Sequence, residues 1–147
     1  MSRYLFFLSF IPVFSFGQSY LDIMSISSLE DFKKVVIEND YQLDHKDESS
    51  VRYNYIGNKH DGTIRTGTFN IKDKTWMFSF IRPDFDYQTT PYDLIVEEIK
   101  NECKYHKIIP DNNVDFVSYS CNESTYVGSL GFVISNGYGI IKMFPTR

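Results

Sequence analysis

The 147-residue sequence predicts an α+β protein built from a tandem αβββ repeat, with one or two antiparallel sheets and both helices on one face. Three observations predict it. An amphipathic helix follows a capping sequence at Ser27, a second capped helix begins 63 residues later at Thr90, and strand-like segments follow each helix. We therefore predict a single domain over residues 18–147, made of two αβββ halves at about 27–81 and 90–144.

The first predicted helix begins after Ser27 and ends near Asn39. Ser27 and Glu30 have the spacing of a capping box, in which each side chain accepts a hydrogen bond from the other residue's backbone N–H. Asn39 tolerates the left-handed conformation that closes many helices. The apolar residues recur at helical spacing and should face the core: Leu29, Phe32, Val35 and Val36.

The rest of the first half is predicted as a loop and three strands. Residues 42–50 are too crowded with charge to present an apolar face, and we expect a solvated connection there. Residues 51–56 alternate apolar and polar side chains, as a half-buried strand does. Residues 64–71 and 75–81 form a hairpin, and one face of its second strand should enter the core with Trp76, Phe78 and Phe80.

The second predicted helix runs from Pro91 to about Tyr105. Thr90 is placed to cap it and Asp93 takes the place that Glu30 has in the first capping box. Pro91 stands at the first helical position, where its missing N–H costs nothing. We expect an exit loop at 107–113 and closing strands at 114–121, 125–135 and 138–144. Asn136-Gly137, between the last two strands, is typical of a type I′ hairpin turn.

The same 63-residue shift also relates the strands of the two halves. It pairs residues of similar type without identity, which indicates an internal repeat. The pairs include Val51 with Val114, Tyr53 with Phe116, Phe69 with Phe132, and Phe78 with Ile141.

The N-terminus reads as an export signal over residues 1–17. Arg3 precedes an apolar run, and Ser15 and Gly17 are the small residues of a cleavage site before Gln18. The apolar run is shorter than the roughly 20 residues that a membrane-spanning helix needs. We expect a secreted or periplasmic protein with no membrane span after cleavage; an apolar N-terminal strand or a membrane anchor is the alternative.

The net charge limits the classes of binding partner, and the two cysteines indicate a disulfide. The net charge of −4 argues against nucleic acid or anionic lipid, since both select basic surfaces. Cys103 and Cys121 are the two cysteines, and an even pair in an exported chain favours a disulfide over two buried thiols. Cys103 and His106 also have the spacing of a nucleophile pair, but no orienting acid or oxyanion hole is apparent beside them.

The sequence contains none of the common catalytic, cofactor or metal-binding motifs, so we assign no catalytic, cofactor or metal residue. A calcium site in the 42–50 loop is the alternative to a solvated connection, although the regular ligand spacing of a calcium loop is missing. A hydrolase-type enzyme would need a pocket that gathers four loop residues: His60, Asp61, Asp84 and Asp86.

The predicted arrangement resembles that of the β-lactamase inhibitor proteins and of small outer-membrane assembly lipoproteins. These are exported proteins in which helices are followed by three or four antiparallel strands. The resemblance covers residues 18–147 as architecture, and it transfers no functional residue. It implies an exported protein whose open sheet face binds another protein.

We therefore expect a non-enzymatic, inhibitor-like binding protein of the cell envelope or exterior, whose partner is another envelope or extracellular protein. An immunity-type protein that neutralises a toxin is a further alternative. Outward-facing strand positions are the candidate binding face: Arg52, Asn54, Arg65 and Gly67 in the first half, with Asp115, Ser129 and Gly131 in the second.

Overall fold

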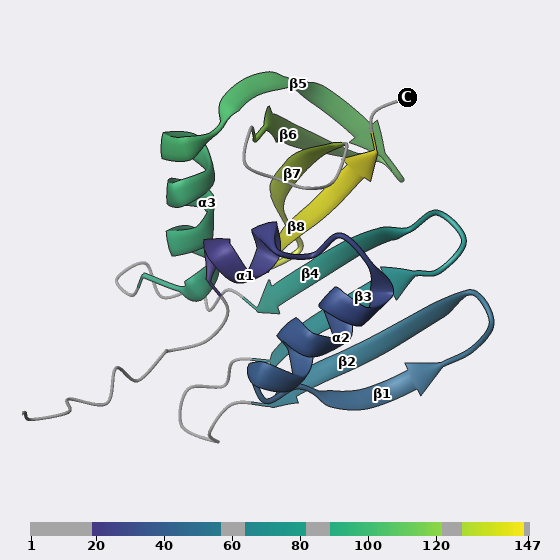
Figure 1. The fold of residues 1–147 in the computed structure, drawn as a ribbon. Helices are drawn as coiled ribbons and strands as arrows, with labels where there is room; N and C mark the ends of the chain where they lie inside the picture. Colours follow the sequence, from purple (N-terminus) through teal and green to yellow (C-terminus); the bar gives the residue numbers. More distant parts are fainter. Residues whose placement is uncertain (1–18, 57–63, 82–88, 122–127, 146–147) are drawn as a thin grey trace, which may run out of the picture.

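A computed structural model describes residues 19–56, 64–81, 89–121 and 128–145. Within these residues three helices accompany one antiparallel sheet of eight strands (Figure 1), and the predicted α+β class is confirmed. The helices are α1 (Tyr20–Met24), α2 (Leu29–Glu38) and α3 (Pro91–Glu102). The strands are β1 (Gln42–Lys46), β2 (Ser50–Ile56), β3 (Ile64–Asn70), β4 (Thr75–Ile81), β5 (Lys104–Asp111), β6 (Val114–Ser120), β7 (Gly128–Ser135) and β8 (Tyr138–Pro145).

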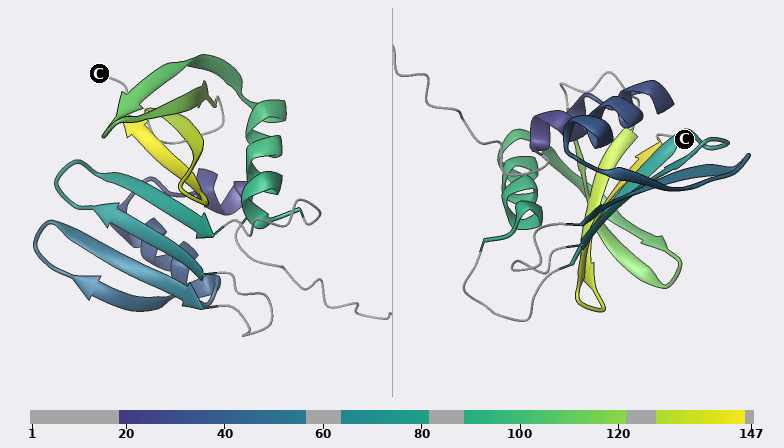
Figure 2. Two further views of the ribbon diagram at one scale, coloured as in Figure 1. Left: turned by 180° about the vertical axis from the view of Figure 1, so that it is seen from behind. Right: turned by 90° about the horizontal axis from the view of Figure 1, so that it is seen from below.

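The strand order is β1-β2-β3-β4-β8-β7-β6-β5, so two antiparallel meanders join along their last strands. β4 pairs with β8, and Phe78 lies opposite Ile141 at this junction. The first strand of each meander, β1 or β5, is therefore an edge of the sheet. Figure 2 shows how strongly the sheet twists between these two edges.

The helix starts follow local capping chemistry. At α3 the predicted capping box is confirmed, because Thr90 accepts a hydrogen bond from the Asp93 N–H and Asp93 accepts one from the Thr90 N–H. At α2 the predicted partner is wrong by one residue, since Ser28 accepts from the Asp31 N–H in place of the Ser27 and Glu30 pair. The short helix α1, which the sequence did not predict, has its own capping box of Ser19 and Asp22.

Two edge strands correct the predicted loops. Residues 42–46 form β1, although every side chain in it is exposed. The second helix ends at Glu102 instead of Tyr105, because Cys103 adopts an extended conformation and leads directly into β5. The helices α2 and α3 are thus each followed by four strands instead of three.

The core lies against the β4 face that carries Phe78, and the prediction that Trp76, Phe78 and Phe80 are buried is confirmed. Phe32 of α2 is fully buried, with its ring 5.6 Å from that of Phe78. Gly67 permits this approach, since a Cβ there would lie 2.6 Å from the Phe78 ring. Tyr92 of α3 packs near Phe80, with ring centroids 6.1 Å apart.

The single shift of 63 residues does not hold across all strands. It matches Phe78 with Ile141, which share a face of the sheet. It also matches Tyr53 with Phe116, yet pairing across the strands places Val117, not Phe116, on the same face as Tyr53. Neighbouring residues of a strand point to opposite faces, so β6 is displaced by one residue relative to the predicted match.

The bridge between Cys103 and Cys121 is present, with Cα atoms 4.5 Å apart. The β5–β6 ladder brings the two cysteines together, because Lys104 pairs with Ser120 and leaves Cys103 and Cys121 at adjacent strand ends. The Tyr20 hydroxyl lies 3.4 Å from the Cys103 Sγ and ties α1 to the bridge.

The two remaining predictions concern the N-terminal export signal and the absence of a membrane span. The export signal of residues 1–17 lies outside the described residues. None of the described helices is long and apolar enough to cross a membrane.

Candidate functional site

The two faces of the sheet differ in chemistry. We call the side that carries Phe78 and its cross-strand partners the Phe78 face, and the opposite side the Met77 face. In β4 the two faces alternate residue by residue, with Met77 and Ser79 on one and Phe78 and Phe80 on the other. The cross-strand partners of Met77 are Thr68 and Lys142.

The Met77 face of the four central strands is almost free of charge. On the described side chains of β3, β4, β8 and β7 this face carries a single charged residue, Lys142, which pairs with Asp111 of β5. A central group of uncharged residues there is half-buried: Thr66, Thr68, Thr75, Met77, Ser79, Ile81, Val133 and Ile140.

The Met77 face continues into a buried corner beneath the twisted end of the sheet. Phe116 is 3% exposed, and its ring lies 5.2 Å from that of Phe144. Gly131 lies under the same ring, since a Cβ there would come within 2.5 Å of it. Ser118, which is fully buried, donates a hydrogen bond to the Lys107 carbonyl.

The structure does not place the predicted binding residues on one face. Arg52, Asn54 and Ser129 belong to the Met77 face, whereas Arg65 and Asp115 belong to the Phe78 face. The expected exposure was correct for Arg52 and Asp115, and Asn54 is half-buried.

Four of the seven candidate positions were wrongly expected to be exposed, because Arg65, Gly67, Ser129 and Gly131 are all buried. Arg65 is 5% exposed because its guanidinium stacks on the ring of Tyr55. Ser129 is also 5% exposed, since it lies opposite Phe144 near the buried corner. Alternation along a strand assigns residues to two faces of the sheet, but it does not predict which face other parts of the chain bury.

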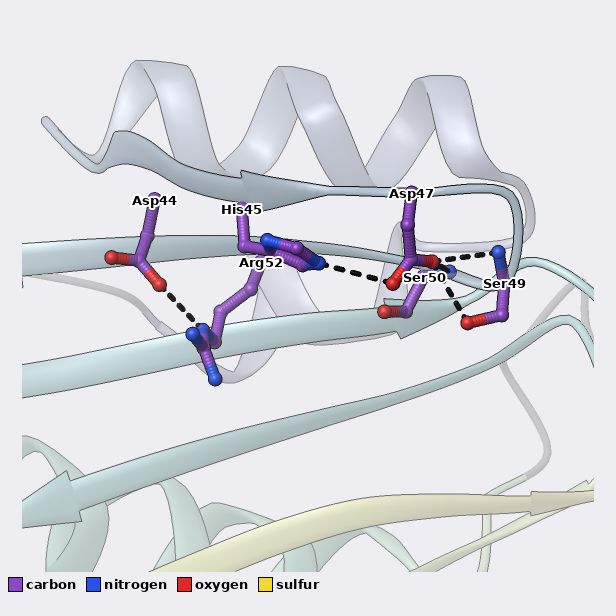
Figure 3. A network of polar contacts seen from close by, with 6 residues as sticks. All are labelled: Asp44, His45, Asp47, Ser49, Ser50 and Arg52. Carbon is purple, nitrogen blue, oxygen red and sulfur yellow. Dashed lines mark hydrogen bonds and ion pairs between the residues drawn. The ribbon is translucent and has the colours of Figure 1, made fainter.

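The charged segment that was predicted as a loop forms the β1–β2 hairpin, and its polar side chains bond to one another (Figure 3). The Asp47 carboxylate accepts hydrogen bonds from the backbone N–H groups of Ser49 and Ser50, at 2.7 and 2.8 Å. His45 Nε2 lies 3.0 Å from the other carboxylate oxygen of Asp47. Arg52 bridges to Asp44 at 2.6 Å.

These contacts stabilise the β1–β2 hairpin, which accounts for its polar side chains without a bound ligand. The residues that the structure describes include no group of three His, Cys, Asp or Glu side chains arranged to hold a metal ion, so the calcium alternative gains no support. The four residues of the enzyme alternative, His60, Asp61, Asp84 and Asp86, lie outside the described residues.

We predict that acid weakens the folded state through Asp47. Hydrogen bonds from His45, Ser49 and Ser50 lower the pKa of this carboxyl below its usual value. A lowered folded-state pKa stabilises the protein above the unfolded value of about 3.9, and this contribution is lost as the pH falls below that value. The melting temperature of Asp47→Asn should therefore fall less than that of the wild type between about pH 5 and pH 2.5.

Glu48→Gln is the matched control, because Glu48 is a neighbouring exposed carboxylate and the hydrogen bonds that hold the turn go to Asp47. Equal acid sensitivity of wild type and Asp47→Asn would mean that the carboxylate is solvated and unimportant to the turn.

Comparison with protein-family models, curated proteins and solved structures found no match to this chain.

The sequence analysis did not identify Met77, Ser79 and Ile140, which lie on the Met77 face, as candidate site residues. The signal in the sequence that distinguishes this side of β4 is its lack of charged residues.

Proposed function

We propose that this chain is an exported, non-enzymatic protein that binds another envelope or extracellular protein through the Met77 face. The proposal rests on the half-buried centre of that face, where the described side chains of the four central strands include a single charge, Lys142, which is paired with Asp111. Centres of protein interfaces are depleted of charge and are ringed by polar residues. Here the Arg52–Asp44 pair lies toward the β1 edge of the sheet, and Lys142, which lies opposite Met77 in the centre, is paired with Asp111 of the other edge strand, β5.

The placement of the helices supports this choice of face. Phe32 of α2 packs against Phe78, and Tyr92 of α3 packs against Phe80. Because Phe78 and Phe80 point to the same side of β4, these contacts favour an arrangement in which both helices cover the Phe78 face. The tandem repeat belongs to the same proposal, with each unit a helix followed by four strands.

Export is supported by two independent features. The apolar run after Arg3 ends in small residues suited to signal cleavage. The Cys103–Cys121 bridge belongs to the kind of bond that persists in oxidising compartments outside the cytosol. We propose that the mature protein begins at Gln18.

Affinity capture with face-specific variants tests the proposed interface. Ser79→Arg adds a charge at the centre of the Met77 face, and burial of that charge at an interface should weaken binding about 10- to 100-fold. Ile37→Arg is the matched control, since Ile37 is 61% exposed on α2.

Both variants and the wild type are used to capture proteins from the envelope fraction of the source cells, and their folding is checked by thermal melting. We expect one partner to bind the wild type and Ile37→Arg and to be lost from Ser79→Arg. Retention of that partner by a folded Ser79→Arg variant would exclude the Met77 face as the interface.

A further inference from the structure

Arg65 is a buried cation on the Phe78 face, away from the proposed protein interface. It is the second residue of β3, and its whole side chain is 5% exposed. The guanidinium carbon lies 3.9 Å from the centre of the Tyr55 ring and 5.9 Å from that of Tyr41. The two tyrosine rings are themselves 5.7 Å apart, so they line the guanidinium as an aromatic pair.

Among the described residues, no group around Arg65 balances its charge. Its Nε and Nη1 atoms are buried, and none of the described residues provides either with a hydrogen-bond partner. No described carboxylate lies within ion-pair distance of Arg65. The ion pairs among the described residues join carboxylates to other basic side chains.

Tyr41 does not supply the missing negative charge. This residue is 5% exposed, and burial raises the pKa of its hydroxyl, although the nearby Arg65 acts in the opposite direction. The ring is therefore neutral at physiological pH. Its contribution to Arg65 is the attraction of a cation to an aromatic face, which offsets only part of the cost of burying a charge.

We infer that Arg65, Tyr41 and Tyr55 form a binding site for a monocarboxylate ligand. A guanidinium donates parallel N–H bonds that match the two oxygens of a carboxylate. The single positive charge balances one negative charge, whereas a phosphate dianion would carry a second into aromatic surroundings. The flanking rings favour a planar apolar body next to the carboxylate, so we assign the site to small aromatic acids.

Benzoate is the probe, and benzamide is its neutral analogue of nearly equal shape. In NMR spectra of the mature protein we expect benzoate to shift the Nε–H signal of Arg65 in a saturable manner and benzamide to leave it unchanged. The signal is assigned by its loss in Arg65→Lys, a variant that keeps the charge but lacks the planar fork. An equal response to both compounds, or none to benzoate, would overturn the carboxylate site.

Thermal melting provides the second readout. Benzoate should raise the melting temperature of the wild type and of Arg52→Met, which removes an exposed arginine as the matched control, but not that of Arg65→Met. Without ligand, Arg65→Met should melt at least as high as the wild type, because it removes a buried unpaired charge.

Two results would contradict the inference. If Arg65→Met melts far below the wild type and benzoate has no effect, the guanidinium already has a partner within the chain and is a structural group. If inorganic phosphate stabilises the wild type and benzoate does not, the site binds an anion of a different class.

Discussion

Replacement of Phe32 by Ala is expected to lower the free energy of unfolding by about 3–5 kcal/mol, the usual cost of deleting a fully buried phenylalanine ring. Phe32 is 0% exposed and is the largest of the buried side chains by which α2 packs on the sheet, the others being Val35 and Val36. Its ring lies within 6.2 Å of three others, from three different strands: Tyr53 of β2, Phe69 of β3 and Phe78 of β4.

The cavity left by this substitution should relax little. Gly67 of β3 lies beneath the ring, and a Cβ at that position would lie 3.3 Å from the Phe32 Cζ. Because no side chain there is available to fill the space, the lost contacts are not recovered. Urea unfolding followed by tryptophan fluorescence measures the effect, since Trp76 is buried in the same core.

Ile37→Ala is the control for Phe32→Ala on the same helix. Ile37 is 61% exposed, and its truncation should change the free energy of unfolding by no more than about 0.5 kcal/mol. Similar losses for the two variants would show that α2 packs on the sheet through a different side.

Removal of the Cys103–Cys121 bridge is expected to cost about 3 kcal/mol, because the unfolded chain then regains the freedom of a closed loop of roughly 19 residues. For a domain of this size, that loss should lower the melting temperature by about 10 °C. Reduction of the wild type and replacement of both cysteines by Ser should have the same effect.

The double Ser variant is also the control for the reducing agent, since it should melt at one temperature with or without reductant. Titration of free thiols in the exported, unreduced protein should find none. Two titratable thiols would contradict the bridge, and the two residues would then be ordinary core cysteines.

Local signals in the sequence predicted most of the regular structure. The Thr90, Pro91 and Asp93 start of α3 was recognisable because capping depends on residues three apart. Asn136-Gly137 was recognisable because both residues take the positive φ angles of a tight hairpin, 51° and 77°. The α2 helix ends as expected near Asn39, although Asp40 takes the left-handed conformation.

The missed features depend on contacts that a local pattern does not contain. β1 was missed because an exposed edge strand has no buried side to impose alternation. The pairing of β4 with β8 joins residues far apart in the chain, and no turn marks it.

The candidate site was predictable only in part. The alternation in β2 and β4 separated the two faces, but the burial of Arg65 depends on Tyr41, which follows α2, and on Tyr55 of the neighbouring strand. From the sequence alone, an arginine in a strand is expected to point to solvent. In the structure Arg65 is buried, because the rings of Tyr41 and Tyr55 lie on the same face of the sheet as its side chain.

Methyl cross-saturation NMR on the complex with the captured partner tests whether the Met77 face contacts that partner. The proposal predicts that saturation of the partner attenuates the methyl signals of Met77, Ile81 and Ile140. Attenuation confined to Ile37 and Leu94, which are exposed on α2 and α3, would place the partner on the helices and contradict the proposed interface.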